Sequence, residues 1–207
     1  MKLKFFSFSL VILSIFGCGK DDKKDTSALI EGSFAGSSYF VIDAGDLVRS
    51  ESQIKGSGSI VFKSPLASTD AKTNYNLTFS LEDGGSVELV AQSDGSLNKG
   101  VSVILTRAGT ALNASLKADD VTTEVKVLSG ISAAGVVTIS IDVHNDESPT
   151  HILLWNGTAD DFAEDAALLN SEADAETPGQ GKSTAWGLVL AKATLTSATL
   201  SDPKFVE

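Results

Sequence analysis

Apolar and polar residues alternate along the chain in short runs from about residue 37 onward. The clearest run is NYNLTFSL (74–81), in which Tyr75, Leu77, Phe79 and Leu81 occupy every second position. Successive side chains of a strand point to opposite faces, so this alternation predicts half-buried β-strands. Similar runs, rich in Thr, Val and Ile, predict further strands at SIVF (59–62), SVELVAQ (86–92), GVSVILTR (100–107), ALNASLKA (111–118), VTTEVKVL (121–128), VVTISIDVH (136–144), THILLWNG (150–157) and AWGLVLAKATLTSATL (185–200), the last broken into two strands around Lys192.

Turn residues separate these runs, as at Asp83-Gly84-Gly85 and Ser93-Asp94-Gly95-Ser96. Eleven or twelve short strands at this spacing predict an all-β fold, an antiparallel two-sheet sandwich. One segment departs from the pattern. Residues 158–169, TADDFAEDAALL, place Phe162, Ala166 and Leu169 at helical spacing, which predicts one short helix near 159–169, followed by an acidic loop.

The first 17 residues have a different pattern. Lys2 and Lys4 precede an apolar run from Phe5 to Phe16. At 1.5 Å per residue this run is about 18 Å long as a helix, too short to span a bilayer core. Basic residues before a short apolar run are typical of a signal peptide, which we expect at residues 1–17.

Cys18 is the single cysteine of the chain, so no intramolecular disulfide is possible. The segment Ile15-Phe16-Gly17-Cys18 resembles the lipobox of bacterial lipoproteins. The resemblance implies a diacylglycerol on the Cys18 sulfur, cleavage before Cys18 and acylation of its new amine, palmitate included. Several acyl chains give a stable membrane anchor where one is marginal. The alternative is an ordinary secreted protein with a cysteine near the cleavage site.

Residues 18–28 then form the lipidated cysteine and a polar, flexible tether, and residues 29–207 form one domain. Without the two N-terminal lysines, 14 basic residues remain against 27 acidic ones, and the formal charge is −13. So acidic a surface repels nucleic acid and argues against a polyanion-binding role. Gly19 after the cysteine favours the outer over the inner membrane of the cell envelope, by analogy with the enterobacterial sorting rule.

Several features together resemble those of concanavalin-like jelly rolls. They are the strand order, the turn near Asn145-Asp146, the WNG strand end and the closing segment WGLVLAKATLTSATLSDPKF. These are the laminin-G, legume-lectin and glucanase type of sandwich, in which a late strand closes the sheet near the first one. The resemblance covers roughly residues 37–206 and implies a fold. It does not by itself fix a function.

An acidic motif, Glu172-Ala173-Asp174-Ala175-Glu176, has the spacing of the Glu-x-Asp-x-Glu strand of laminarinases and lichenases. In those enzymes the first Glu is the nucleophile and the last the general acid, on one face of the strand. Here alanines replace the bulky apolar residues between the acids, and alanine and acid disfavour a strand. We therefore expect a solvated acidic loop, no catalytic residue and no enzyme activity.

Oxygen-bearing residues at the predicted turns could hold calcium, which jelly rolls of this group often bind at a sheet rim. The candidates are Asp83, Asp94, Asn98, Asp142, Asn145 and Asp146. The alternative is that these residues cap their own turns. His144 and His151 flank one such turn, where two histidines alone do not make a zinc site.

Trp155 and Trp186, the two tryptophans, are candidates for stacking on sugar rings, with packing in the core or rim as the alternative. The sequence thus predicts an envelope lipoprotein that presents a non-catalytic, lectin-like sandwich to a glycan or an envelope protein. Two alternatives stay open: a glycoside hydrolase that uses residues 172–176, and a purely structural envelope protein.

Overall fold

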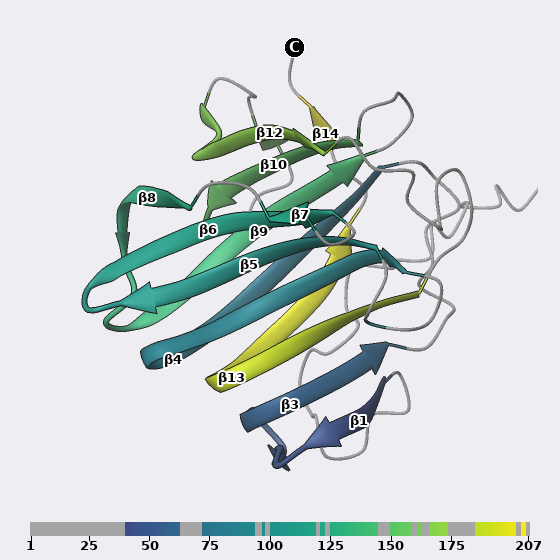
Figure 1. Ribbon diagram of the computed structural model, residues 1–207, viewed down its shortest axis with the longest axis vertical. Helices are drawn as coiled ribbons and strands as arrows, with labels where there is room; N and C mark the ends of the chain where they lie inside the picture. The colour runs from purple at the N-terminus through teal and green to yellow at the C-terminus, as the bar shows by residue number, and fades with distance from the viewer. Residues whose placement is uncertain are drawn as a thin grey trace, which may run out of the picture.

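The computed structural model describes residues 40–62, 72–93, 97, 100–118, 121–122, 125–144, 150–158, 161–162, 166–173, 185–201 and 204–205. These residues are almost entirely β-strand, and twelve of the strands belong to one continuous, largely antiparallel hydrogen-bonded sheet. The sheet folds over itself into two facing layers (Figure 1). The all-β, antiparallel two-layer sandwich expected from the sequence is therefore confirmed.

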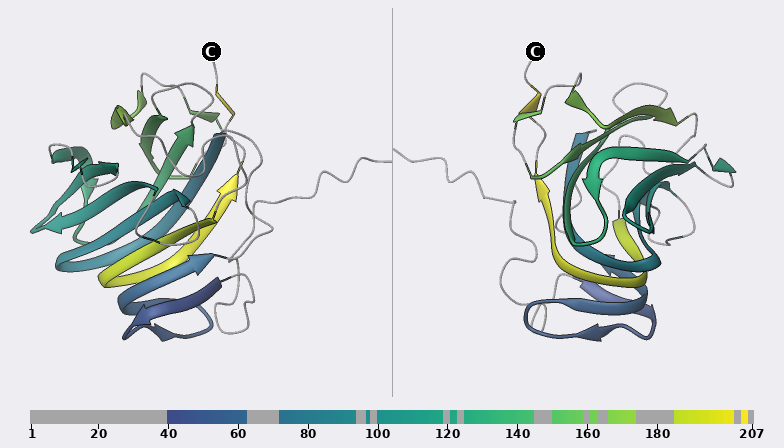
Figure 2. Two further views of the ribbon diagram at one scale, coloured as in Figure 1. Left: turned by 45° about the vertical axis from the view of Figure 1, so that its right-hand side comes forward. Right: turned by 90° about the vertical axis from the view of Figure 1, so that its left-hand side faces the viewer.

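Three long strands belong to both layers: β3 (Ile54–Phe62), β4 (Lys72–Ser93) and β13 (Ala185–Ser201). Strand β13 lies between the other two from Trp186 to Leu195, and its pairing shifts on both sides near Lys192. The right-hand view of Figure 2 shows the yellow β13 curving through this bend. We call the bend the corner, and we call the opposite end of the sandwich, where these strands begin or finish, the open end.

Layer A contains the halves of the long strands at 58–62, 86–93 and 185–191. Its other strands are β1 (Phe40–Gly45), β5 (Val101–Ala108), β6 (Ala111–Ala118), β7 (Val121–Thr122) and β8 (Lys126–Ser132).

Layer B contains the remaining halves at 54–56, 72–81 and 193–201. Its other strands are β2 (Val48–Arg49), β9 (Val136–His144), β10 (Thr150–Asn156) and β12 (Leu169–Ala173). A separate parallel pair joins β11 (Asp161–Phe162) to β14 (Lys204–Phe205).

Alternation places one apolar face of each layer in the shared core. On β4 the inward residues are Tyr75, Leu77 and Phe79 in layer B, and Val87 and Leu89 in layer A, all at most 4% exposed. Strand β13 pairs with β3, which pairs with β1, so the late strand closes the sheet near the first one, as the resemblance implied.

The corner differs from the sequence prediction in a specific way. Turn residues 83–85 were expected to separate two strands, and Lys192 to separate two others, but each site is a bend inside one strand. Lys192 has a positive φ of 48°, and four residues of β4, 82–85, lie opposite it. Hydrogen bonding continues across both bends, so the chain changes layer without leaving the sheet.

Hydrogen bonds fasten the corner to its surroundings. The Lys192 amide donates to Ser57 Oγ at 3.0 Å. The Gly109 amide, in the β5–β6 turn, donates to Asp83 Oδ1 at 2.7 Å, and Arg107 Nη1 donates to the Leu81 carbonyl at 2.7 Å. Gly85 is buried there, and a Cβ on it would lie 2.8–2.9 Å from three backbone oxygens. Only glycine fits this close approach of the two bent strands.

The short helix predicted near residues 159–169 is wrong for the described part of that segment. Asp161 and Phe162 form β11, and Leu169 begins β12. Leu169 is 7% exposed in the core, where it pairs with Leu154 of β10, so tertiary pairing overrides the local helical spacing. None of the described residues forms a helix long and apolar enough to cross a membrane.

Candidate functional site

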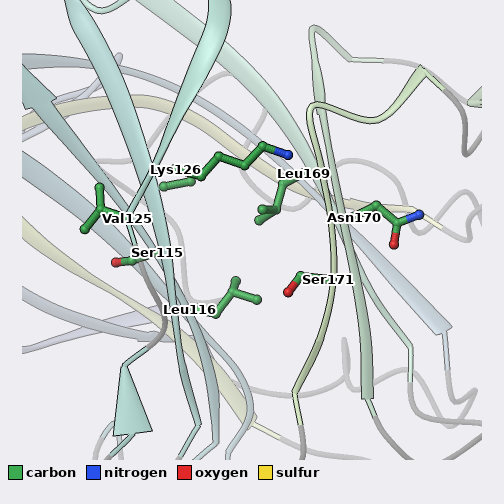
Figure 3. Close-up of a pocket in the computed structure, with 8 residues that line it drawn as sticks. Ser115, Leu116, Val125, Lys126, Leu169, Asn170 and Ser171 are labelled. Carbon is green, nitrogen blue, oxygen red and sulfur yellow. The ribbon is translucent and has the colours of Figure 1, made fainter.

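A cleft of about 420 Å³ opens between the two layers at one side edge of the sandwich. Strand β6 of layer A and strand β12 of layer B form its walls, and residues at the start of β8 close one side (Figure 3). The lining residues are Ala114, Ser115, Leu116, Val125, Lys126, Leu169, Asn170 and Ser171. A volume in this range suits a small organic ligand.

The cleft lies where β6 and β12 are incompletely covered by neighbouring described strands. On its outer side β6 pairs with β7 at Lys117 and Ala118, and with β8 at Ala111, Asn113 and Ala114. Among the described strands, neither pairing includes residues 115–116. On the facing layer, β12 pairs with β10 and with no second described strand. The two edges therefore leave a gap through which the sandwich interior is reached.

Apolar and polar side chains share the cleft. Leu116 and Leu169 belong to the hydrophobic core, at 2% and 7% exposure, and face the cleft from opposite layers (Figure 3). The Ser171 side chain also points into it, whereas the Asn170 side chain points away. Asn170 Oδ1 lies 2.6 Å from His151 Nε2 on the outer surface of layer B. The interior thus offers two leucines and one hydroxyl group to a ligand.

Lys126 is the one charged residue of the lining, and no carboxylate lies among the eight residues. Its side chain extends across the cleft toward Leu169 of the facing layer (Figure 3). Within the described residues its ammonium group makes no ion pair or hydrogen bond. The mouth of the cleft therefore carries a positive charge on a chain whose net charge is −11.

The face of layer B that points away from the core carries a second group of polar residues. Cross-strand pairs between β4 and β9 follow one another there: Thr78 with Thr138, whose hydroxyls are 3.2 Å apart, Asn76 with Ser140, which are hydrogen-bonded, and Asn74 with Asp142. We call these six residues the polar ladder. Asn74 and Asp142 are 2% and 0% exposed, so the ladder is covered at this end.

One end of the polar ladder suits a cation. Asn74 Oδ1 is buried and accepts no hydrogen bond within the described part of the chain. Its strand neighbour Asp142 supplies a buried carboxylate, and Ca²⁺ takes amide and carboxylate oxygens of this kind. No group of three His, Cys, Asp or Glu side chains able to hold a metal occurs among the described residues. The two oxygens would thus be a partial ligand set.

The other residues named for calcium are placed as follows. Asp83 is at the corner, where it accepts the hydrogen bond from Gly109 described above. Asp94, Asn98, Asn145 and Asp146 lie outside the described residues, in segments that join β4 to β5 and β9 to β10. The strand ends that these segments join lie at the open end, toward which Asp142 also lies on β9.

Both tryptophans are packed. Trp186 is 2% exposed in the core and stacks on Phe62 with ring centroids 3.7 Å apart, and Tyr75 meets it edge-on at 5.2 Å. Trp155 is 3% exposed, and it lies on the same face of layer B as the polar ladder, opposite Ser140. Neither indole lines the described cleft, and sugar stacking on either ring stays a prediction.

The structure places the first residue of the acidic motif on a strand. Glu172 is exposed on β12, opposite His151 of β10, and Asp174 and Glu176 lie outside the described residues. The acidic loop expected after residue 169 is therefore wrong for 170–173, which are strand. His144 and His151 are strand partners, as the expected hairpin-like turn between them requires. Glu172 does not line the cleft.

Cys18 and residues 1–39 lie outside the described residues, so the anchor and the tether stay predictions. None of the cleft residues Leu116, Lys126, Leu169 and Ser171 was predicted to be a site residue. The run ALNASLKA correctly predicted a strand at β6, but nothing in the pattern shows that β6 and β12 face each other across a gap.

Comparison with solved structures supports the fold. The VIP36 exoplasmic/lumenal domain, in its Ca²⁺/Man3GlcNAc-bound form, has a TM-score of 0.53 at 11% identity, over 89% of this chain and 91% of that chain. Peanut lectin has a TM-score of 0.51 at 11% identity, over 82% and 94%. A carbohydrate-binding module, CBM66 from Bacillus subtilis, has a TM-score of 0.46 at 12% identity, over 83% and 94%.

No protein-family profile matches the chain, and no curated protein is significantly similar to it in sequence. At these identities the structural likeness concerns the fold alone. The described domain is a concanavalin-like, lectin-type jelly roll.

Proposed function

We propose that this protein is a non-catalytic saccharide-binding module that a lipidated Cys18 holds at the cell envelope. The observation that carries the binding function is the edge cleft between β6 and β12. It offers both apolar carbons and polar groups in a volume of about 420 Å³. Solved proteins of the same fold support the choice of ligand, since the VIP36 domain is described as bound to Man3GlcNAc.

The lining suits a sugar ring better than a wholly apolar ligand. A sugar presents C–H groups on its faces and hydroxyl groups around its rim. The small accessible parts of Leu116 and Leu169 can touch the C–H groups, and the Ser171 hydroxyl and the Lys126 ammonium can bond to ring hydroxyls. A small number of polar groups on an apolar wall is the usual composition of a ligand site.

The absence of catalysis is part of the proposal. Retaining glycosidases need two carboxyl groups about 5 Å apart beside the scissile bond, and inverting ones need them somewhat farther apart. The described cleft lining contains no carboxyl group, and Glu172 is on the exposed surface of β12 outside it. A saccharide bound there meets no described acid or base that could cleave it.

A glycan array probed with the full-length protein in detergent tests the binding function. Ser171→Phe fills the cleft with a ring, and we expect at least a tenfold loss of affinity for whichever saccharide the wild type binds. Ser129→Phe is the matched control, because Ser129 is exposed on β8 and lies outside the cleft lining. Absence of binding to every saccharide, or unchanged binding by the Ser171 variant, would contradict the proposal.

The envelope location rests on the N-terminal pattern of the sequence. We propose cleavage before Cys18, acylation of its sulfur and amine, and the outer membrane as the favoured destination. Mass spectrometry of the native protein should find the N-terminal peptide heavier by a diacylglycerol and one acyl chain. Cys18→Ser should move the protein from the membrane fraction to the soluble fraction. An unmodified Cys18 or a retained leader would overturn the anchor.

Calcium is the cofactor that the fold and the polar ladder support together. We propose that Asn74 Oδ1 and the Asp142 carboxylate supply two of its oxygen ligands. Bound Ca²⁺ at one hundred times its Kd adds about 2.7 kcal/mol to the free energy of unfolding, which for this size raises Tm by roughly 5–10 °C.

Thermal unfolding with Ca²⁺ or with EDTA measures this effect. Asp142→Asn should abolish the Tm shift, and Asp83→Asn, the same change at the corner, should keep it. A wild-type Tm that does not respond to Ca²⁺ rules the site out.

A further inference from the structure

The charge of the described cleft lining is opposite in sign to the net charge of the protein. The chain carries 27 acidic and 16 basic residues, yet the eight lining residues include one lysine and no acid. Glu172, next to Ser171 on β12, is outside the lining. Among the described residues, a ligand in the cleft therefore meets a local positive charge, whereas the net charge of the protein is negative.

The position of Lys126 fits a role toward a ligand. It begins β8 and pairs with Ala114 of β6, so its backbone is fixed by the sheet at the wall of the cleft. Its side chain crosses the cleft toward Leu169, and its ammonium has no counter-charge among the described residues (Figure 3). The Ser171 side chain points into the cleft from the opposite layer. The ammonium and the hydroxyl on opposing walls are both donors, and the ammonium also supplies a charge for an anionic ligand.

The negative net charge of the protein favours a singly charged anion over a doubly charged one. A net charge of −11 repels a doubly charged phosphate more strongly than a singly charged carboxylate. One ammonium group also balances one charge, not two. We propose that the cleft recognises an acidic saccharide whose carboxylate binds Lys126, with the sugar ring at the mouth of the cleft beside Ser171. This inference rests on the saccharide-binding function proposed above and names the class of its ligand.

A set of matched saccharides tests the inference. We would present each uronic-acid oligosaccharide on an array beside the same oligosaccharide after chemical reduction of its carboxyl groups. The two members differ in charge and share linkage and ring shape. A charge-assisted hydrogen bond predicts at least about tenfold tighter binding of the acidic member at low salt. Raising the salt concentration should weaken that preference, because the contact lies at the protein surface.

Substitutions at Lys126 test whether this residue causes the preference for the acidic sugar. Lys126→Met should remove the preference for the acid, because it lowers affinity for the acidic member more than affinity for the reduced one, and only the acidic member loses a charge-assisted contact. Lys126→Arg should restore part of the preference. Lys117→Met is the matched control, since Lys117 lies on the neighbouring β6, outside the cleft lining. It should leave the preference unchanged, and equal losses in both variants would indicate a general charge effect and overturn the inference.

The outcomes separate this inference from the proposed function. Equal or tighter binding of the reduced sugars overturns the acidic ligand class and leaves saccharide binding intact. Binding of no saccharide of either kind overturns both. If the wild type prefers the acidic sugar and Lys126→Met keeps that preference, then Lys126 does not bind the carboxylate.

Discussion

The two layers of the sandwich meet at the corner and at the β6–β12 edge, and the two junctions are built differently. At the corner the backbone itself joins the layers through β3, β4 and β13, and side-chain hydrogen bonds from Asp83 and Arg107 fasten the bend. At the edge, β6 and β12 of opposite layers face each other across a cleft. The first junction is organised for stability, and the second leaves room for a ligand.

The difference between the corner and the β6–β12 edge has a physical basis. Continuous strands satisfy their backbone hydrogen bonds through a bend at little cost, so a corner can be closely packed. An edge strand leaves donors and acceptors unpaired, and proteins normally cover or blunt it. A site at such an edge can hold a ligand without disturbing the corner. Substitutions at the two junctions should accordingly affect different properties.

The largest effect is expected at the corner. Gly85→Ala places a methyl group 2.8–2.9 Å from the backbone oxygens of Lys192, Ala191 and Glu82, and backbone cannot move aside as a side chain can. We expect a loss of about 3 kcal/mol or more in the free energy of unfolding, measured by urea denaturation. Gly135→Ala is the control, because no atom lies within 4 Å of its added Cβ. Comparable losses in both variants would show that the corner is not specially packed.

Substitutions of two leucines compare the stability contributions of the enclosed core and of the cleft wall. Leu77 is completely buried in the layer B half of β4, whereas Leu116 lines the cleft. Leu77→Ala should cost about 4 kcal/mol because it leaves an enclosed cavity. Leu116→Ala should cost about 2 kcal/mol, since the new space joins the existing cleft and fills with water. Chemical denaturation gives both values, and an equal cost would mean that the cleft is closed in solution.

The hydrogen bond between Gly109 and Asp83 should make a smaller contribution. Asp83→Ala removes the acceptor of the 2.7 Å bond and is expected to cost about 1 kcal/mol. Asp83→Asn keeps an oxygen in place and should recover most of that loss. The difference in denaturation midpoint between the two variants measures the bond. No difference between them would show that it does not fasten the corner.

The smallest stability effect is expected at the cleft. Lys126→Met changes an exposed side chain with no partner among the described residues, and should alter the free energy of unfolding by less than about 0.5 kcal/mol. The same variant is expected to change ligand preference about tenfold. A stability loss above 1 kcal/mol would show that Lys126 also supports the fold, against the separation of the two junctions.

The sequence predicted most strands because alternation reports a half-buried face directly. It did not predict that β4 and β13 continue through their bends. Gly84 and Gly85 are turn residues by composition, and only the pairing with β13 shows that the chain stays in the sheet. The helical spacing of Phe162, Ala166 and Leu169 was misleading, because Leu169 is buried by its pairing with Leu154.

The candidate site was less predictable than the fold. VTTEVKVL was expected to be one strand, but β7 and β8 are separate, and the interruption lies opposite residues 115–116. The cleft depends on that interruption and on the position of β12, which local sequence does not encode. Its polar residues Asn170 and Ser171 looked like part of a loop, because nothing local identifies a short polar strand whose one described strand partner is β10.

Mapping the bound saccharide on the backbone by NMR tests the central claim most directly. Amide shifts should move at residues 115–116, 125–126 and 169–171 when the acidic sugar is added, and should stay unchanged at corner residues 83–85 and 109. The largest shifts at Asn74, Ser140 and Asp142, or at the corner, would place the ligand elsewhere and contradict a binding site in the edge cleft.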